Sequence, residues 1–199
     1  MRVTIVSGSH RPDSQSGKVA RHVAHVLAGE VEAVVDLGRT PLPLWDPEFD
    51  AMTPAWQRGW APVAGQLAAA DALVFVTPEW GGMVPAALKN LFLLCTGGEI
   101  AHKPALIVAV ASGQGGAYPV AELRMSSYKN THVCFIPEHV IVRNVGELLN
   151  DPDHPGTEAD RLLRERMRYA LDLLRAYAGA LRQVRDSGVV DRVKFPFGM

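Results

Sequence analysis

Residues 2–18 read RVTIVSGSHRPDSQSGK, an apolar, β-branched run followed by a serine-rich loop. The run over 2–7 stops at Gly8, which is typical of a short buried strand that ends in a turn. A helix is expected from about Gly17 to Ala28, after the polar loop. This stretch therefore predicts a strand, a loop and a helix at the start of the chain.

The rest of the chain repeats this unit. Further strands are expected at 31–37, 72–76, 105–111 and 133–142, and Pro137 is expected to interrupt the last of them. Further helices are expected at 54–70, from the end of the 77–85 loop to Cys95, at 118–130 and at 157–186. Residues 38–54 hold four prolines and are expected to form a surface loop. Strands that alternate with helices favour a parallel sheet covered on both faces. The sequence predicts a doubly wound, five-stranded α/β fold, with residues 1–199 as a single domain.

The composition excludes some classes of protein. Hydrophobic residues make up 48% and charged residues 21% of the 199, and the formal net charge is -1. This balance is typical of globular proteins and gives no basic field for nucleic acid or a membrane surface. No signal peptide or membrane-spanning run is expected. Cys95 and Cys134 lie in apolar runs without CxxC spacing, so we expect buried free thiols and a cytoplasmic location.

The loop over residues 7–18 has the chemistry of an anion site. In a doubly wound sheet, ligands bind beyond the carboxyl ends of the strands, where this loop lies. Its serine hydroxyls, free backbone amides and following helix N-terminus favour a phosphate, to which Arg11 adds a charge. The alternative is a capped surface turn. Ser16-Gly17-Lys18 resembles part of a P-loop, but Val19 replaces Ser/Thr and residue 12 is not Gly, so nucleotide hydrolysis is not expected.

Two more loops fall at the same edge. Residues 77–90, TPEWGGMVPAALKN, pair an aromatic residue with two glycines, which favours close approach to a flat ligand with Trp80 as a wall. The alternative is a helix-initiating turn with a core tryptophan. Glu79 is expected to be a solvated carboxylate rather than an acid or base. Residues 112–118, SGQGGAY, could donate amides to a ring-edge carbonyl or form a simple tight turn.

Together these loops resemble those of the NADPH-dependent FMN reductase family, which has a flavodoxin-like fold. SGSHRPDS is similar to its G-S-x-R-x-x-S phosphate loop, TPEWGGMVPAALKN to its T-P-E-Y-N-x-x-x-P-x-x-L-K-N segment, and SGQGG with AELR at 121–124 to its third flavin loop. Trp80 stands where Tyr is usual and Gly81 where Asn is usual. The likeness covers about residues 2–145.

The resemblance implies an enzyme that passes hydride from NADPH or NADH to FMN, and on to a small-molecule acceptor such as a flavin, a quinone, an azo dye or a metal oxyanion. It places Ser7, Ser9, Arg11, Ser14 and Ser16 at the FMN phosphate, Pro78, Glu79, Trp80, Gly81 and Gly82 along the ring, and Ser112, Gly113, Gln114, Gly115 and Gly116 at its pyrimidine side. No protein acid or base and no metal is expected. The alternatives are a flavodoxin-like electron carrier, which would be strongly acidic, and an FMN-binding regulatory protein.

An oligomer is expected from the run over 91–95, LFLLC. Five consecutive apolar residues cover the whole circumference of a helix, whereas a helix on a sheet should keep a polar outer face. A second subunit would cover the outer side of Phe92 and wall the flavin site. The resembling family often forms dimers or tetramers, so a homodimer or a homotetramer is expected.

Other candidate residues are expected to be structural. These are His22 and His25 as a surface pair rather than metal ligands, Trp56 and Trp60 as packing residues, and Asp151, Asp153 and His154 as turn residues.

Overall fold

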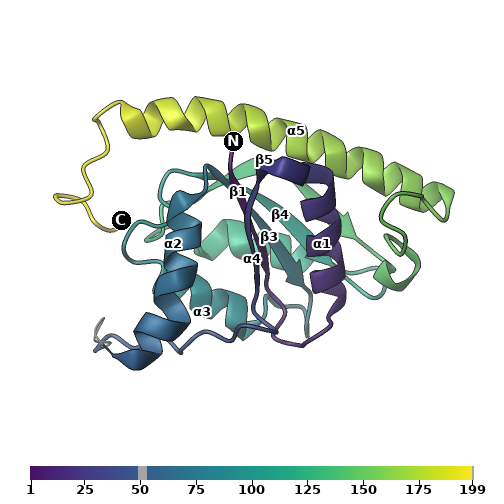
Figure 1. Ribbon diagram of the computed structural model, residues 1–199, viewed down its shortest axis with the longest axis horizontal. Coiled ribbons are helices and arrows are strands. Elements are labelled where there is room, and N and C mark those ends of the chain that lie inside the picture. Colours follow the sequence, from purple (N-terminus) through teal and green to yellow (C-terminus); the bar gives the residue numbers. More distant parts are fainter. Residues whose placement is uncertain (49–52, 199) are drawn as a thin grey trace.

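Figure 1 shows a computed structural model that describes residues 1–48 and 53–198. The elements are β1 (Val3–Ser7), α1 (Gln15–Leu27), β2 (Val31–Asp36), α2 (Ala61–Ala69), β3 (Ala72–Pro78), α3 (Ala86–Leu94), β4 (Pro104–Val110), α4 (Ala117–Ser126), β5 (Cys134–Val142) and α5 (Glu158–Asp186). A π-helical turn, Trp56–Trp60, leads into α2. The predicted alternation of strands and helices is confirmed. Within the predicted 38–54 loop, residues 49–52 lie outside the described part.

The five strands form one parallel sheet in the order β2-β1-β3-β4-β5. The chain order reverses beside β1, because β2 pairs with one edge of β1 and β3 pairs with the other. Loops that leave β1 and β3 therefore diverge and open a crevice at the carboxyl edge, where ligands bind in doubly wound sheets. The predicted doubly wound, five-stranded sheet is confirmed.

Helices α1 and α5 cover one face of the sheet, and α2, α3 and α4 cover the other (Figure 1). Every residue of β1, β3 and β4 is buried as a result. Along β3, Val74 and Val76 pack under α1 and α5, whereas Leu73 and Phe75 pack under the other helices. This alternation follows from the two-residue period of a strand, and burial on both faces explains the uninterrupted apolar runs.

Pro137 interrupts β5, as predicted. The pairing of β4 with β5 shifts register between Ala105 and Ile107, opposite the proline. Proline has no N–H to donate to the neighbouring strand. The Arg124 side chain instead donates from Nη2 to the carbonyl oxygens of Ile136 and Pro137, at 2.7 and 2.9 Å. A side chain of α4 thereby hydrogen-bonds the carbonyl groups of β5 where its pairing with β4 is interrupted.

The apolar run over 91–95 does not leave an apolar outer face, so the reason given above for a partner subunit is wrong. Leu91, Phe92, Leu94 and Cys95 are all buried inside the chain, and only Leu93 is exposed, at 51%. The Phe92 ring lies 4.9 Å from the Phe75 ring, centroid to centroid. The helix ends at Leu94, so the run is covered by the sheet on one side and by the following loop on the other.

The His22 and His25 prediction is also partly wrong. His25 is half-exposed and its Nε2 lies 3.0 Å from Oδ1 of Asp153, but His22 is buried, at 6% exposure. His22 is close to the charged residues Asp160 and Arg164 of α5, and the apolar residues of α1 and α5 share one core cluster. Both cysteines are free, as expected, but Cys134 is only half-buried.

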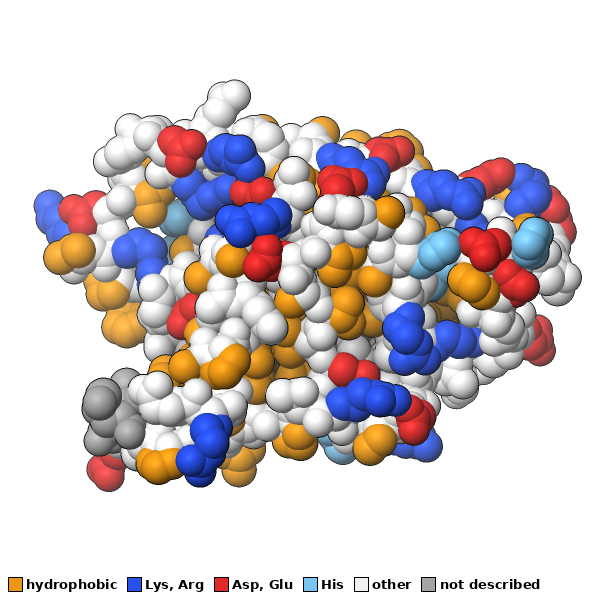
Figure 2. Space-filling view, in the orientation of Figure 1, with side chains coloured by type: hydrophobic (Ala, Val, Ile, Leu, Met, Phe, Trp, Pro, Cys, Tyr) orange, Lys and Arg blue, Asp and Glu red, His pale blue; other side chains and the backbone are white. Residues whose placement is uncertain are grey.

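The remaining structural predictions are confirmed. Trp60 is fully buried with the Trp56 ring 6.0 Å away, and Oδ1 of Asp151 accepts the N–H groups of Asp153 and His154 in a turn. None of the helices in the described residues is long and apolar enough to cross a membrane. Charged side chains of both signs are interspersed over the face that carries α5 and α1 (Figure 2).

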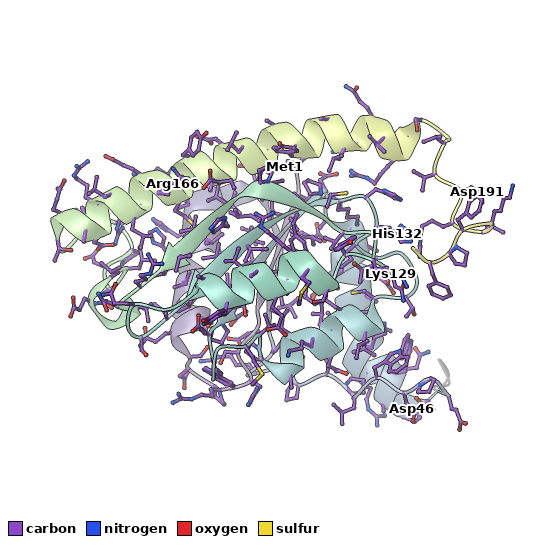
Figure 3. All side chains as sticks on the ribbon, turned by 180° about the vertical axis from the view of Figure 1, so that it is seen from behind. Met1, Asp46, Lys129, His132, Arg166 and Asp191 are labelled. Atoms are coloured by element: carbon purple, nitrogen blue, oxygen red, sulfur yellow. The ribbon has the colours of Figure 1, made fainter. Side chains whose placement is uncertain are left out.

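After α5 the chain turns back along the opposite edge of the molecule from the carboxyl ends of the strands. Figure 3 shows this segment, with Asp191, running beside the loop that holds Lys129 and His132. Arg192 fastens it by donating from Nη1 to the carbonyl oxygen of Gly97 at 2.9 Å. The C-terminal region outside the family resemblance thus packs on the same sheet through α5 and on a neighbouring loop through its end.

Candidate functional site

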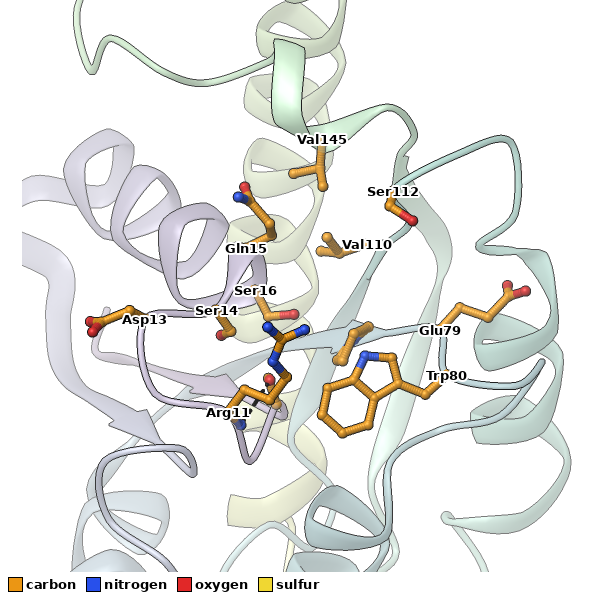
Figure 4. A pocket seen from close by; sticks show the side chains of 12 residues that line it. Arg11, Asp13, Ser14, Gln15, Ser16, Glu79, Trp80, Val110, Ser112 and Val145 are labelled. Atoms are coloured by element: carbon orange, nitrogen blue, oxygen red, sulfur yellow. Dashed lines mark hydrogen bonds between the residues drawn. The ribbon is translucent and has the colours of Figure 1, made fainter.

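A cavity of about 230 Å³ opens at the carboxyl edge of the sheet, between the loops that follow β1, β3, β4 and β5 (Figure 4). Its lining residues are Ser9, Arg11, Asp13, Ser14, Gln15, Ser16, Pro78, Glu79, Trp80, Val110, Ser112 and Val145. Arg11 and Trp80 extend from different loops toward one space, with Ser14 and Ser16 beside Arg11 and Ser112 farther across. All three predicted loops therefore meet at one cavity.

The start of α1 forms the polar end of the cavity. Ser14 is the N-cap, and its Oγ accepts the N–H of Gly17 at 3.0 Å. The first turn of a helix leaves further N–H groups without partners, here those of Gln15 and Ser16. The hydroxyl of Ser16 is buried and has no hydrogen-bond partner among the residues that the structure describes. Capping therefore uses Ser14, and it leaves the Ser16 hydroxyl and the first amides of the helix facing the cavity end unused by the cap.

Arg11 gives this end of the cavity its positive charge. Among the described residues its exposed guanidinium has no carboxylate partner, while its backbone N–H donates to Oγ of Ser9 at 3.2 Å. Asp13 also lines the cavity, but its carboxylate accepts a hydrogen bond from Arg39. The acidic side chain is thus neutralised from outside, and the arginine charge remains available for an anion.

Lys18 does not serve as a phosphate-binding lysine. Its Nζ donates to the carbonyl oxygens of Val145 and Leu148, each at 2.7 Å, and to Oδ1 of Asn150 at 2.8 Å. Burial lowers the pKa of this lysine from its ordinary value, and the Asp160 carboxylate opposes that shift. Lys18 therefore ties α1 to the loop after β5, in agreement with the expectation that this is not a P-loop.

The flat side of the cavity is built around Trp80. The N–H and carbonyl groups of Trp80 and Met83 exchange hydrogen bonds at 3.1 and 3.0 Å. Gly81 and Gly82 between them have φ values of +58° and +74°, which a two-residue turn of this type requires and glycine supplies without strain. The imidazole of His10 packs edge-to-face on the indole, with ring centroids 4.5 Å apart.

Two opposite charges hold the glycine-rich loop after β4. Oε2 of Glu79 accepts the N–H of Gly116, and the Glu79 side chain points away from Arg11 (Figure 4). From the other side, Nε of Arg143 donates to the carbonyl oxygens of Gln114 and Gly115 at 2.8 and 3.1 Å. The loop is therefore fixed by side chains from the loops after β3 and β5.

The cavity gathers eight of the residues predicted from sequence, namely Ser9, Arg11, Ser14, Ser16, Pro78, Glu79, Trp80 and Ser112. Seven lie outside its lining: Ser7, Gly81, Gly82, Gly113, Gln114, Gly115 and Gly116. Ser7 is buried in β1, where its hydroxyl finds no partner in residues 1–48 and 53–198, and the glycines form the two turns beside the cavity.

Sequence reasoning missed several residues of this site. Asp13, Gln15, Val110 and Val145 line the cavity, and Arg143 supports it. The position of Arg143 directly after β5, at the same sheet edge as the other loops, is the one signal that could have indicated it. No cluster of three His, Cys, Asp or Glu side chains suited to a metal occurs in residues 1–48 and 53–198.

Comparisons with known proteins show the family to which the chain belongs. The family model described as NADPH-dependent FMN reductase matches residues 1–147, and the chain belongs to that family. An NADPH azoreductase of Bacillus sp. (strain OY1-2) is 27% identical over 192 residues, 93% of this chain and 97% of that protein. A quinone reductase of Pseudomonas putida is 32% identical over 121 residues, 58% of this chain and 63% of that protein.

Solved structures show the same architecture. FerB, a flavoenzyme NAD(P)H:(acceptor) oxidoreductase from Paracoccus denitrificans, has a TM-score of 0.72 at 21% identity, over 88% of this chain and 98% of that chain. An archaeal flavodoxin has a TM-score of 0.53 at 12% identity, over 89% of this chain and 99% of that chain. The fold is flavodoxin-like, and the protein is an NAD(P)H-dependent oxidoreductase that uses FMN.

Proposed function

We propose that FMN binds in this cavity with its phosphate at the start of α1 and its ring beside Trp80. The unpartnered, buried hydroxyl of Ser16 carries this proposal, because a buried polar group without a partner is costly unless a ligand satisfies it. Ser9, Ser14 and Arg11 supply further donors around the same point. Hydroxyls, free amides and one guanidinium fit a phosphate dianion.

The ring would then lie between the loops after β3 and β4. Pro78–Gly82 would form one wall, with Trp80 as its aromatic part, and Ser112–Gly116 would face the pyrimidine side. The amides of Gly113, Gln114 and Gly115 would donate to ring carbonyls, since Glu79 already takes the N–H of Gly116. The residues place and polarise the ring, and none needs to act as an acid or base.

We propose a quinone- or azo-type compound as the acceptor, as the names of the relatives suggest. When bound, FMN supplies hydride transfer, so that NAD(P)H, a proton and a quinone give NAD(P)⁺ and a hydroquinone. The family match favours this enzyme over a flavodoxin-like electron carrier or a regulatory FMN-binding protein, for which rapid bleaching of the flavin by NADPH is not expected.

Comparing FMN with riboflavin tests the phosphate assignment, because the two differ only in the phosphate. Arg11→Ala and Ser16→Ala should weaken FMN binding to apo-protein, by roughly 1.5–3 kcal/mol for the arginine, and leave riboflavin affinity unchanged. Arg21→Ala, an exposed arginine on α1 outside the cavity lining, is the control. Equal FMN affinity in wild type and both variants would show that the phosphate does not bind at Arg11 and Ser16.

We also propose that residues 1–199 act as one domain, since α5 packs on the same sheet as the helices before it. The two free thiols support a cytoplasmic location.

A homodimer or homotetramer remains our expectation for the assembly, now supported by the groove between α3 and α4 rather than by the run over 91–95. The groove measures about 350 Å³ and its apolar lining includes Val84, Leu93 and Leu123.

A further inference from the structure

A second cleft, of about 220 Å³, lies next to the FMN cavity at the same edge of the sheet. It is formed by the end of β2, the following proline-rich loop and the first turns of α3. Its lining residues are His10, Leu37, Pro41, Leu42, Leu44, Ala86, Ala87 and Asn90. None of them lines the FMN cavity, so the cleft is separate from it.

One pair of rings separates the two spaces. Trp80 lines the FMN cavity and His10 lines the cleft, and their ring centroids are 4.5 Å apart in edge-to-face contact. A group in the cleft would therefore lie one ring away from the wall of the flavin site. A single acceptor molecule can reach across that distance if it carries a substituent beside its redox-active ring.

The cleft is held in shape by Asn90, which is 8% exposed. Its Nδ2 donates to the carbonyl oxygen of Pro43 at 2.9 Å, and its Oδ1 accepts the N–H of Trp45 at 2.7 Å. The N–H of Leu37 donates to the carbonyl oxygen of Ser7 at 3.1 Å. These bonds fix the loop at both ends of the cleft, which leaves Leu44 at the rim with 81% of its surface exposed.

The two spaces differ in charge. Arg11, Asp13 and Glu79 line the FMN cavity, whereas none of the described residues that line the cleft is an acid, a lysine or an arginine. An apolar cleft selects an uncharged, apolar group, because a charged one would lose its hydration without a partner. We propose that this cleft binds the apolar substituent of a quinone or azo acceptor whose redox-active group reacts at the FMN, an inference that rests on the function proposed above.

Two quinones that differ only in a substituent test this directly. We compare kcat/KM for phenyl-para-benzoquinone and for para-benzoquinone with NADPH, using protein loaded with FMN. Wild type should prefer the phenyl compound. Ala86→Trp fills the cleft from an exposed helix position, and Leu44→Asp places a charge at its rim. Each should lower the ratio of the two kcat/KM values about tenfold, the scale of one buried aromatic group.

Ala176→Trp, on the exposed side of α5, is the control and should keep the wild-type ratio. An unchanged ratio in both cleft variants, with FMN bound, would overturn the proposal. An equal loss for both quinones together with a change in oligomeric state would also overturn it, because the cleft would then belong to a subunit interface. Failure of wild type to bind FMN or oxidise NADPH would instead contradict the proposed function.

Discussion

Glu79 holds the glycine-rich loop beside the cavity through its carboxylate. It binds the N–H of Gly116, and Arg143 binds two carbonyl oxygens of the same loop from the opposite side. A carboxylate that accepts from a backbone N–H makes a stronger bond than a neutral group does. The pair thus fixes the loop whose remaining amides we propose to face the flavin ring, so we expect Glu79 to position the ring rather than to move protons.

Replacing Glu79 separates positioning of the loop from proton transfer. Glu79→Ala should weaken FMN binding about tenfold, because it removes one charge-assisted hydrogen bond to the loop. Glu79→Gln keeps an oxygen that accepts the Gly116 N–H but loses the charge, so it should lose less FMN affinity than Glu79→Ala. With FMN bound, both variants should oxidise NADPH within about tenfold of wild type, less than the loss of a general base causes.

FMN titration and stopped-flow flavin reduction measure the two quantities, and melting of the apo-proteins controls for folding. A thousandfold slower reduction in Glu79→Gln with the flavin still bound would show that the carboxylate takes part in the chemistry. Loss of FMN affinity in Glu79→Gln equal to that in Glu79→Ala would show that the charge, rather than the hydrogen bond, positions the loop.

At the residue scale, sequence motifs indicated the right loops but only some of the reasons for their residues. Gly81 and Gly82 are needed for the positive φ of a tight turn, and a Cβ on Gly115 would meet Oε1 of Glu79 at 2.9 Å. His10 and Arg143 were missed because their partners are far away in the sequence. Ring contacts and loop carbonyls of this kind are set by tertiary structure, which spacing along one chain does not reveal.

At the element scale, the junction of α1 with α5 differs most from the expectation. Asp160 and Arg164 form a buried ion pair at 3.2 Å, and Arg164 donates to the carbonyl oxygens of Asp151 and Pro152. Burial opposes ionisation of Asp160, but hydrogen bonds from Arg164 and from two backbone N–H groups lower its pKa overall. His22 lies close to this pair and is buried, and within the described part of the chain neither of its ring nitrogens is hydrogen-bonded.

This burial makes His22 a source of acid sensitivity. Desolvation, and then the charge of Arg164, lower its pKa to about 4, from about 6.5 when unfolded. The unfolded chain therefore binds the proton first, and stability falls as the pH drops from about 6.5 toward 4. The Asp160 carboxylate opposes this lowering of the His22 pKa, whereas the positive charges of His25 and Arg168 add to it.

His22→Leu should reduce this pH dependence, by up to about 3 kcal/mol between pH 7 and pH 4. Urea unfolding of apo-protein at several pH values measures the free energy of unfolding. His154→Gln, an exposed histidine on the loop after β5, is the control and should keep the wild-type slope. A slope in His22→Leu as steep as that of wild type would assign the acid sensitivity to other groups.

At the scale of the whole molecule, the alternation of apolar runs and helical segments was sufficient to predict the sheet and its two helical layers. Completely apolar runs such as 72–76 require cover on both faces, which a doubly wound arrangement provides. The order of the strands was not derivable in the same way, since it depends on which side of β1 each crossover takes. The run over 91–95 did not predict an interface, because the C-terminal end of α3 is enclosed within the chain and has no outer face open to solvent there.

The apolar groove between α3 and α4 is the surface on which we base the expectation of a second subunit. Leu93 stands at its edge with 51% exposure, whereas Phe92 beside it is 7% exposed and packs against Phe75. A charge at position 92 would therefore disrupt the core before it affected an interface, so Leu93 is the informative site. A closed dimer buries the same patch from both copies, which doubles the effect of one substitution.

Leu93→Asp should convert the wild-type oligomer to a folded monomer, because two carboxylates would be buried across the symmetric contact without partners. Light scattering on a sizing column at micromolar concentration gives the mass, and circular dichroism confirms the fold. Leu162→Asp introduces the same change at a leucine of equal exposure on α5 and should leave the mass unchanged. A wild-type monomer would rule out the oligomer itself. A stable oligomer in Leu93→Asp would instead keep the oligomer and place its interface away from the α3–α4 groove.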